Sequence, residues 1–341
     1  MILNNSIHKK HFELWLKTSI FLIFLMILVG GLTRLTDSGL SITEWELFSG
    51  VLPPFGDQKW NEYFLLYKKT TQFTILNSNM TIDEFKVIYY WEYFHRFLGR
   101  LIGLIYIFPL IYFTFRKIIN KNYLLNFYLI FFLILFQGII GWYMVVSGLS
   151  NEVTVSHYRL SIHLITAFFI MGLIYWNYLN IILDKNKSLI IFLKNKLFFF
   201  LFILILLQII FGAFVSGLDA GKIYNTWPLM NNNFYPDDLL FNSWKQILDF
   251  NDRSLVQFYH RLLAYVVFLS SIIYGFFLFK KNRFLFIKYY SIFLIILFIQ
   301  ALIGVFTLIS GVNIYFASAH QLVGVILFLS FIRVVYGYNT R

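Results

Sequence analysis

Eight long apolar runs, separated by short polar segments, restrict the folds open to this chain of 341 residues. Most of them reach the roughly 20 residues that an α-helix needs to cross the hydrocarbon core of a bilayer. We therefore predict an all-α polytopic membrane protein with eight transmembrane helices. The runs are residues 14–33, 87–115, 123–147, 158–182, 196–217, 254–279, 285–310 and 316–336.

The composition agrees with a membrane protein and excludes several other classes. Charged residues make up 13% of the chain, against about 25% in soluble domains. The formal net charge of +12 does not indicate nucleic-acid binding, because Lys and Arg cluster in short segments between apolar runs, as in cytoplasmic loops. The lipid bilayer is thus the expected partner, and nucleic acid is not. The chain has no cysteine, so a redox centre would depend on His, Met or carboxylate ligands.

Charged residues also predict the orientation in the membrane. Residues 34–85 hold seven Asp and Glu against four Lys and Arg, and residues 218–253 hold five against three. By the positive-inside rule these two long loops lie outside a bacterial inner membrane, and both termini are cytoplasmic. No signal-peptide cleavage site precedes Phe21, so the first run is expected to remain as a span. The basic residues on the cytoplasmic side are Lys9, Lys10, Lys17, Arg116, Lys117, Lys121, Lys185, Lys187, Lys194, Lys196, Lys280, Lys281, Arg283, Lys288 and Arg341.

The two halves of the chain resemble each other. Each half contains four apolar runs, so both halves start from the same side of the membrane and the repeat is parallel, about an axis along the membrane normal. Two four-helix bundles are the expected architecture, with residues 1–182 in the first and 183–341 in the second. The matching stretches are Gly31–Trp45 with Gly212–Trp227, Gln137–Gly141 with Gln300–Gly304, and Ser161–His163 with Ser318–His320.

Four histidines occupy corresponding places in this repeat: His95 and His163 in the first half, His260 and His320 in the second. Each lies in the first turns of a run that begins outside, so all four are expected at one depth near the outer face. Two facing histidines in a helix bundle commonly hold one haem at both axial positions. Zinc fits less well, because it takes four ligands and each bundle offers two imidazoles. Of the other histidines, His8 and His11 are expected in solvent, and His157 behind the site or on the surface.

A carboxylate distinguishes the first half. Glu92 stands three residues before His95 on one helix face, and Gln257 takes the same place before His260. A carboxylate can accept a proton or stabilise a developing cation, whereas an amide cannot. The first half is therefore predicted to do the chemistry and the second to store electrons. Three arginines beside the ligands could either bind haem propionates or extend to the membrane interface: Arg96, Arg159 and Arg261.

These motifs resemble haem A synthase, the membrane enzyme that converts haem O to haem A for cytochrome oxidase. The resemblance covers essentially the whole chain, and it is closest to the proteobacterial and mitochondrial branch, which lacks cysteine pairs in the outer loops. The stretches that carry it are GGLTRLTDSGLSITEW (30–45), EYFHRFLGR (92–100), QGIIGWYMVVSGL (137–149), VSHYRLSIHL (155–164), VSGLDAGKIYNTWPLM (215–230), QFYHRLLAY (257–265) and ASAHQLVG (317–324).

The resemblance implies a role for each half. His260 and His320 would ligate a resident haem b, while His95 and His163 would bracket the substrate, haem O, with Glu92 beside the reacting edge. The implied reaction oxidises a ring methyl to a formyl group by successive hydroxylations, with oxygen derived from water. Glu92 would activate that water or stabilise a cationic carbon. The implied protein partners are haem O synthase as the donor, cytochrome oxidase assembly factors and a second copy of the chain.

Two other functional classes compete with this interpretation. A di-haem b-type electron carrier, acting as a quinol oxidoreductase, also needs four histidines in two pairs. Such carriers usually place one haem near each membrane face, whereas here all four histidines lie near the outer face. A transporter with a haem-free histidine relay is disfavoured, because charged residues are scarce in the other four runs.

The long outer loops leave two interpretations open. Their aromatic residues could form a belt at the membrane interface, or the loops could fold over the bundles as lids. The Trp and Pro residues that raise the question are Trp45, Pro53, Pro54, Trp60, Trp227, Pro228, Pro236 and Trp244.

The predicted orientation can be tested with reporter fusions. A reporter that is active only in the cytoplasm should give a signal when fused after Arg341 and none when fused after Gly221, because the loop charges place these points on opposite sides. The reverse pattern would place the histidines near the cytoplasmic face and contradict the orientation.

Overall fold

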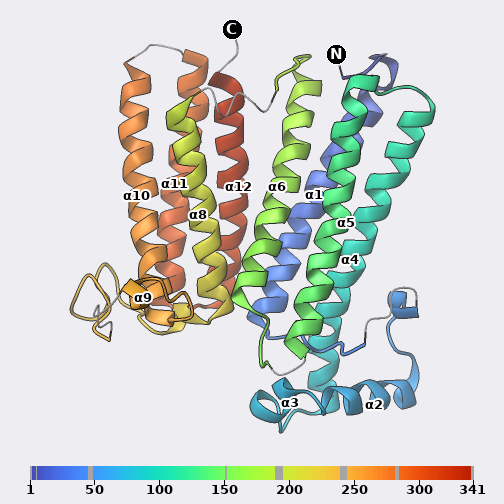
Figure 1. Ribbon diagram of the computed structural model, residues 1–341, viewed down its shortest axis with the longest axis vertical. Helices are drawn as coiled ribbons and strands as arrows, with labels where there is room; N and C mark the ends of the chain where they lie inside the picture. The colour runs from blue at the N-terminus through green and yellow to red at the C-terminus, as the bar shows by residue number, and fades with distance from the viewer. Residues whose placement is uncertain are drawn as a thin grey trace.

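The structure is a computed structural model that describes residues 2–4, 6–44, 49–149, 152–188, 195–238, 244–280 and 284–338. Within these ranges it contains eight helices long and apolar enough to cross a membrane, which confirms the predicted all-α, multi-pass fold (Figure 1). They are α1 (Lys9–Leu35), α4 (Ile82–Phe115), α5 (Lys121–Leu149), α6 (His157–Ile182), α8 (Lys196–Gly217), α10 (Arg253–Phe279), α11 (Phe284–Ile309) and α12 (Ile314–Tyr338). Trp45, Lys194, Lys281, Arg283 and Arg341, which the sequence interpretation used, lie outside the described residues.

The spanning helices pack as two groups of four. In the first group α1 contacts α4 and α6, and α5 contacts the same two helices; in the second, α10 contacts α8 and α11, and α11 contacts α12. The groups meet where α6 packs against α8 and α12, and where α1 packs against α12. Helix α1 begins and α12 ends at the same end of the molecule (Figure 1). The domain boundary between residues 182 and 183 stays a prediction, which this packing pattern supports.

The first outer loop is a folded helical segment. It contains α2 (Gly56–Tyr67) and α3 (Thr71–Leu76), and α4 begins at Ile82, five residues before the predicted run. Thr81 and Glu84 form a capping box there, in which the Glu84 carboxylate accepts a hydrogen bond from Thr81 N at 2.8 Å. The extended end of α4 packs against α2 through buried aromatic residues. The cluster is Ile42, Trp60, Tyr63, Phe64, Tyr67, Phe85, Ile88 and Tyr89.

The outer tryptophans therefore have different environments. Trp60 is buried in that cluster, with its ring 5.0 Å from the ring of Tyr89, so it belongs to the core of the loop and not to a membrane belt. Trp227 and Trp244 of the second outer loop are exposed. Helix α9 (Trp244–Ile247) of that loop lies at the same end of the molecule as α2 and α3 (Figure 1).

One arginine at the end of α1 links the two halves. Arg34 Nη1 donates to Asp37 at 2.8 Å, while Nη2 donates to Asp219 at 2.9 Å and to the carbonyl oxygen of Ser216 at 2.8 Å. Asp37 and Asp219 hold equivalent places in the repeat, and both have left-handed backbone conformations, with φ of 51° and 52°. The second half has Ser216 at the position equivalent to Arg34. The guanidinium of Arg34 therefore binds the aspartates of both halves.

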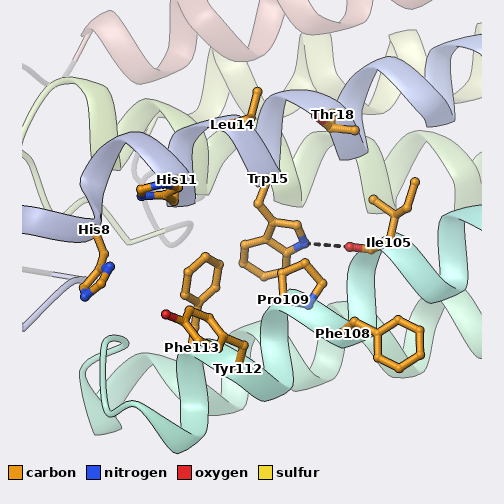
Figure 2. Close-up of a pocket in the computed structure, with 10 residues that line it drawn as sticks. All are labelled: His8, His11, Leu14, Trp15, Thr18, Ile105, Phe108, Pro109, Tyr112 and Phe113. Carbon is orange, nitrogen blue, oxygen red and sulfur yellow. Dashed lines mark hydrogen bonds between the residues drawn. The ribbon is translucent and has the colours of Figure 1, made fainter.

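A cavity of about 580 Å³ lies between α1 and α4, near the start of α1 (Figure 2). Pro109 has no N–H, so the carbonyl oxygen of Ile105 lacks its usual helical partner. Trp15 Nε1 donates to that oxygen at 3.1 Å and restores the hydrogen bond. His8 and His11, expected in solvent, line this cavity; His11 is exposed and His8 is half-buried. The cavity is about 14 helical residues, or roughly 21 Å, along α4 from His95.

The link through Arg34 predicts a pH-dependent stability. Burial disfavours the charge on Asp219, but Arg34 and Lys222 outweigh it and hold its pKa below the usual value. A lowered pKa stabilises the folded state above about pH 4, the unfolded pKa, and that stability is lost as the pH falls through the folded pKa. Asp219→Asn, which tolerates the left-handed backbone, should lower the melting temperature at pH 7 by about 2 °C.

Thermal unfolding in detergent, measured across pH, tests this prediction. The difference in melting temperature between Asp219→Asn and wild type should shrink below pH 4. Glu62→Gln is the matched control, because its ion pair with Lys59 lies on the exposed surface of one helix. A difference that stays constant down to pH 2 would contradict the role of the Asp219 charge.

Candidate functional site

The fold brings the four predicted ligands together as two pairs. The ring centres of His95 on α4 and His163 on α6 are 6.4 Å apart, and those of His260 on α10 and His320 on α12 are 6.5 Å apart. An iron bound by two imidazoles lies about 2 Å from each nitrogen, which puts the ring centres about 6 Å apart. Both pairs therefore fit one haem iron between two axial ligands.

The chemistry of the donor set also fits haem. In the described part of the chain, no group of three or more His, Cys, Asp or Glu side chains is placed to hold a metal ion. A zinc site, which needs four ligands, is therefore not supported at either pair. The Nδ1 atoms of His95 and His163 are buried and have no hydrogen-bond partner among the described residues. Each pair offers two imidazoles, which is the donor set of a bis-histidine haem.

Each of the four imidazoles lies against a glycine of a neighbouring helix. A Cβ atom added at Gly30, Gly141, Gly212 or Gly304 would come within 2.8–3.2 Å of the Cε1 atom of His95, His163, His260 or His320, respectively. A contact this short forces a side chain to move, so glycine is what allows each ring to sit against the helix backbone. The sequence interpretation missed this role, although Gly141, Gly212 and Gly304 stand in the repeated motifs. The structure also shows that Gly30, rather than Gly31, corresponds to Gly212 by its contact with the ligand.

Glu92 is buried, with 2% of its surface exposed, and four hydrogen bonds hold its carboxylate. Oε2 accepts from Ser41 Oγ at 2.8 Å and from Ile42 N at 2.9 Å. Oε1 accepts from Arg96, from Nη2 at 2.6 Å and from Nε at 3.1 Å. Every partner is a donor and one is a guanidinium, so both carboxylate oxygens are engaged in hydrogen bonds.

Gln257 occupies the matching place in the second half without the charge. It is equally buried, and its Nε2 atom donates to the carbonyl oxygen of Tyr224 at 3.0 Å. Its Oε1 atom and Arg261 Nε are both buried and have no hydrogen-bond partner among the described residues. The two halves thus share a backbone arrangement but differ in one buried charge.

Two of the three arginines beside the ligands, Arg96 and Arg261, bind the outer loops. Arg96 Nη2 donates to the carbonyl oxygen of Ile42 at 3.0 Å, and Arg261 Nη2 donates to that of Tyr224 at 2.7 Å, an equivalent position in the repeat. The guanidinium of Arg159 lies 4.8 Å from the ring centre of Tyr143. Contact of these arginines with haem propionates stays a prediction.

His157 does not join either pair. It is the first residue of α6, is buried, and packs with its ring centre 5.1 Å from that of Phe214 on α8. A Cβ atom at Gly217 would come 2.6 Å from its Cβ. His157 is therefore part of the contact between the halves. The prediction that it could lie on the surface is wrong, because its side chain is buried.

Comparisons with known proteins agree over the length of the chain. The COX15-CtaA family model, described as a cytochrome oxidase assembly protein, matches residues 13–332. The haem A synthase of Pelagibacter ubique (strain HTCC1062) is 47% identical over 338 residues, which cover 98% of this chain and 99% of that relative. Haem A synthases of Bartonella henselae and Flavobacterium psychrophilum are 43% and 40% identical, over 92% and 94% of this chain and 88% and 96% of theirs.

The glycine contacts predict how each site responds to one added methyl group. Gly304→Ala would place Cβ 2.8 Å from His320 Cε1 and should lower haem occupancy of that pair about tenfold or more, because overpacking typically costs about 1–3 kcal/mol. Gly103→Ala on α4, where nothing lies within 4 Å, is the control. Haem per purified chain is the measurement, and equal occupancy in both variants would contradict the packing argument.

Proposed function

The chain belongs to the COX15-CtaA family of cytochrome oxidase assembly proteins, and we propose that its two halves divide the work of a haem A synthase between them. The chain is a multi-pass membrane oxidoreductase of heme biosynthesis. In this proposal the first half binds haem O between His95 and His163 and oxidises its ring methyl, and the second half holds haem b between His260 and His320. One observation carries the proposal. Glu92 is a buried carboxylate in the first half, and the equivalent residue of the second half, Gln257, is an amide.

His260 and His320 would hold the resident cofactor. When bound, haem b supplies a one-electron redox centre. The residues of this half have to keep two neutral imidazoles at a fixed spacing, and the contacts with Gly212 and Gly304 support that spacing. Gln257 leaves this half without a buried carboxylate next to its ligands.

Glu92 is proposed to act on charge in the first half. Its carboxylate accepts four hydrogen bonds, two of them from a guanidinium, which fix its position beside His95. Because both oxygens already accept hydrogen bonds from the protein, Glu92 is proposed to stabilise positive charge at the reacting carbon and not to accept a proton from water. The same hydrogen bonds attach residues 41–42 to α4, so Glu92 also orders the loop beside the site.

The sequence supports a proposal for the surroundings of the sites. The haem sites are placed near the outer face of a bacterial inner membrane, with both termini in the cytoplasm. Haem O synthase is proposed as the donor of the substrate, with cytochrome oxidase assembly factors and a second copy of the chain as further partners. A pure di-haem electron carrier would give the difference between Glu92 and Gln257 no role.

Glu92→Gln tests the proposed chemistry. Glutamine keeps the size of the side chain and removes its charge, so haem content should stay near wild type. Haem A formed per bound haem should fall about 10²- to 10⁴-fold, the usual effect of removing such a group. Haem O or a hydroxymethyl form should accumulate in cells that express the variant. Haem extraction and chromatography measure both quantities.

Gln257→Glu is the matched control in the second half. The new carboxylate would lose the hydrogen bond that Gln257 donates to Tyr224, but it would lie beside Arg261 Nε, which has no hydrogen-bond partner among the described residues. This ion pair, like that of Glu92 with Arg96, replaces the lost bond, so the variant should fold and keep its haem. In the Glu92→Gln background it should not restore haem A formation. An unchanged yield of haem A per bound haem in Glu92→Gln would remove Glu92 from the chemistry. A loss of haem in proportion to activity would leave it a structural role only.

A further inference from the structure

A second difference between the halves lies one helical turn before the glycines that contact the ligands. The residue four positions before each glycine lies one turn away on the same face of its helix. Three of these residues are glutamines and one is a methionine. The four sets are Met26 with Gly30, Gln137 with Gly141, Gln208 with Gly212, and Gln300 with Gly304.

In the second half the glutamine amides touch the ligand rings. Gln208 Nε2 lies 3.2 Å from Nδ1 and 3.4 Å from Nε2 of His260. Gln300 Nε2 lies at the same two distances from the ring nitrogens of His320. The Oε1 atoms of both glutamines are buried and have no hydrogen-bond partner among the described residues. A half-turn of the Gln300 amide would bring its oxygen to an Nδ1–H group of His320. Gln208 Nε2 also donates to the backbone carbonyl oxygen of His260 at 3.2 Å, so this amide contacts both the ring and the backbone of its ligand.

In the first half no such contact reaches a ring nitrogen. Gln137 Nε2 donates to the backbone carbonyl oxygen of His163 at 2.8 Å, as Gln208 does to that of His260, but Gln137 has no contact with a ring nitrogen among the described residues. Met26 stands in the place of Gln208, and its thioether is at best a weak acceptor. The Nδ1 atoms of His95 and His163 accordingly lack partners within the described part of the chain.

We propose that Gln208 and Gln300 are positioning residues that retain haem in the second half, and that Met26 makes the first half a site that releases haem. The inference rests on the proposed function, in which the cofactor must stay bound while the product must leave. A partner that fixes the orientation and basicity of a ligand histidine typically changes metal affinity by about 10- to 100-fold. The second half has an amide at both rings, whereas among the described residues of the first half no amide reaches a ring nitrogen.

Exchanging the residues between halves tests this inference. Gln208→Met gives the second half the residue of the first, and Met26→Gln does the reverse. The readout is the rate at which each haem leaves the purified protein for an excess of apomyoglobin, with haem b distinguished from haem O and haem A by absorbance. Gln208→Met should speed the loss of haem b about tenfold and weaken its low-spin spectrum. Met26→Gln should slow the loss of haem O or haem A by a similar factor.

Two ligand variants separate this inference from the proposed function. His260→Ala should remove haem b, and His95→Ala should remove the substrate haem; if His260→Ala kept haem b with an unchanged spectrum, the assignment of the halves would be wrong. If the assignment held but Gln208→Met released haem b at the wild-type rate, the retention role would be overturned. If Gln208→Met does not fold, Met26→Gln still tests the inference. Loss of haem O or haem A at the wild-type rate or faster would contradict it.

Discussion

The packing of each ligand imidazole against a glycine sets the spacing on which the rest of the site depends. Without a Cβ on the facing helix, the backbone of α1, α5, α8 or α11 can lie directly against the ring of a histidine on α4, α6, α10 or α12. This contact blocks one side of each ring and leaves the two rings of a pair facing each other at about 6 Å. Because buried imidazoles are costly in an apolar interior, such an arrangement is stable when a metal or hydrogen-bond partner satisfies the nitrogens.

On this repeated frame, the differences between the halves are few and buried. The first half has a carboxylate held by four hydrogen bonds, and the second has an amide whose oxygen has no hydrogen-bond partner among the described residues. The second half has a glutamine at each ligand ring, whereas the first has a methionine at one of the two positions. The first difference, Glu92 against Gln257, places a carboxylate beside one site. The second, Met26 against Gln208, changes the contacts that hold a ligand histidine. Together they suit a protein in which one haem reacts and leaves while the other remains.

Much of the fold could be predicted from the sequence, because each span is a continuous apolar run and lipid imposes its length. The histidine pairs followed from the repeat, since equivalent residues of parallel repeats lie at equal depth. The hydrogen bonds of Glu92 with Ser41 and Ile42 could not be predicted, because they join residues about 50 positions apart across a loop without periodicity. The same is true of Arg34, whose bond to Asp219 spans 185 positions and breaks the symmetry of the repeat.

The most direct test of two haem sites with different roles is the haem content of the purified protein. Haems extracted in acidified organic solvent, separated by chromatography and counted per chain should give two haems per chain. One should be haem b, and the other should be haem O, its hydroxymethyl form or haem A. A single haem per chain, or two copies of haem b, would contradict the division between a reacting half and a retaining half.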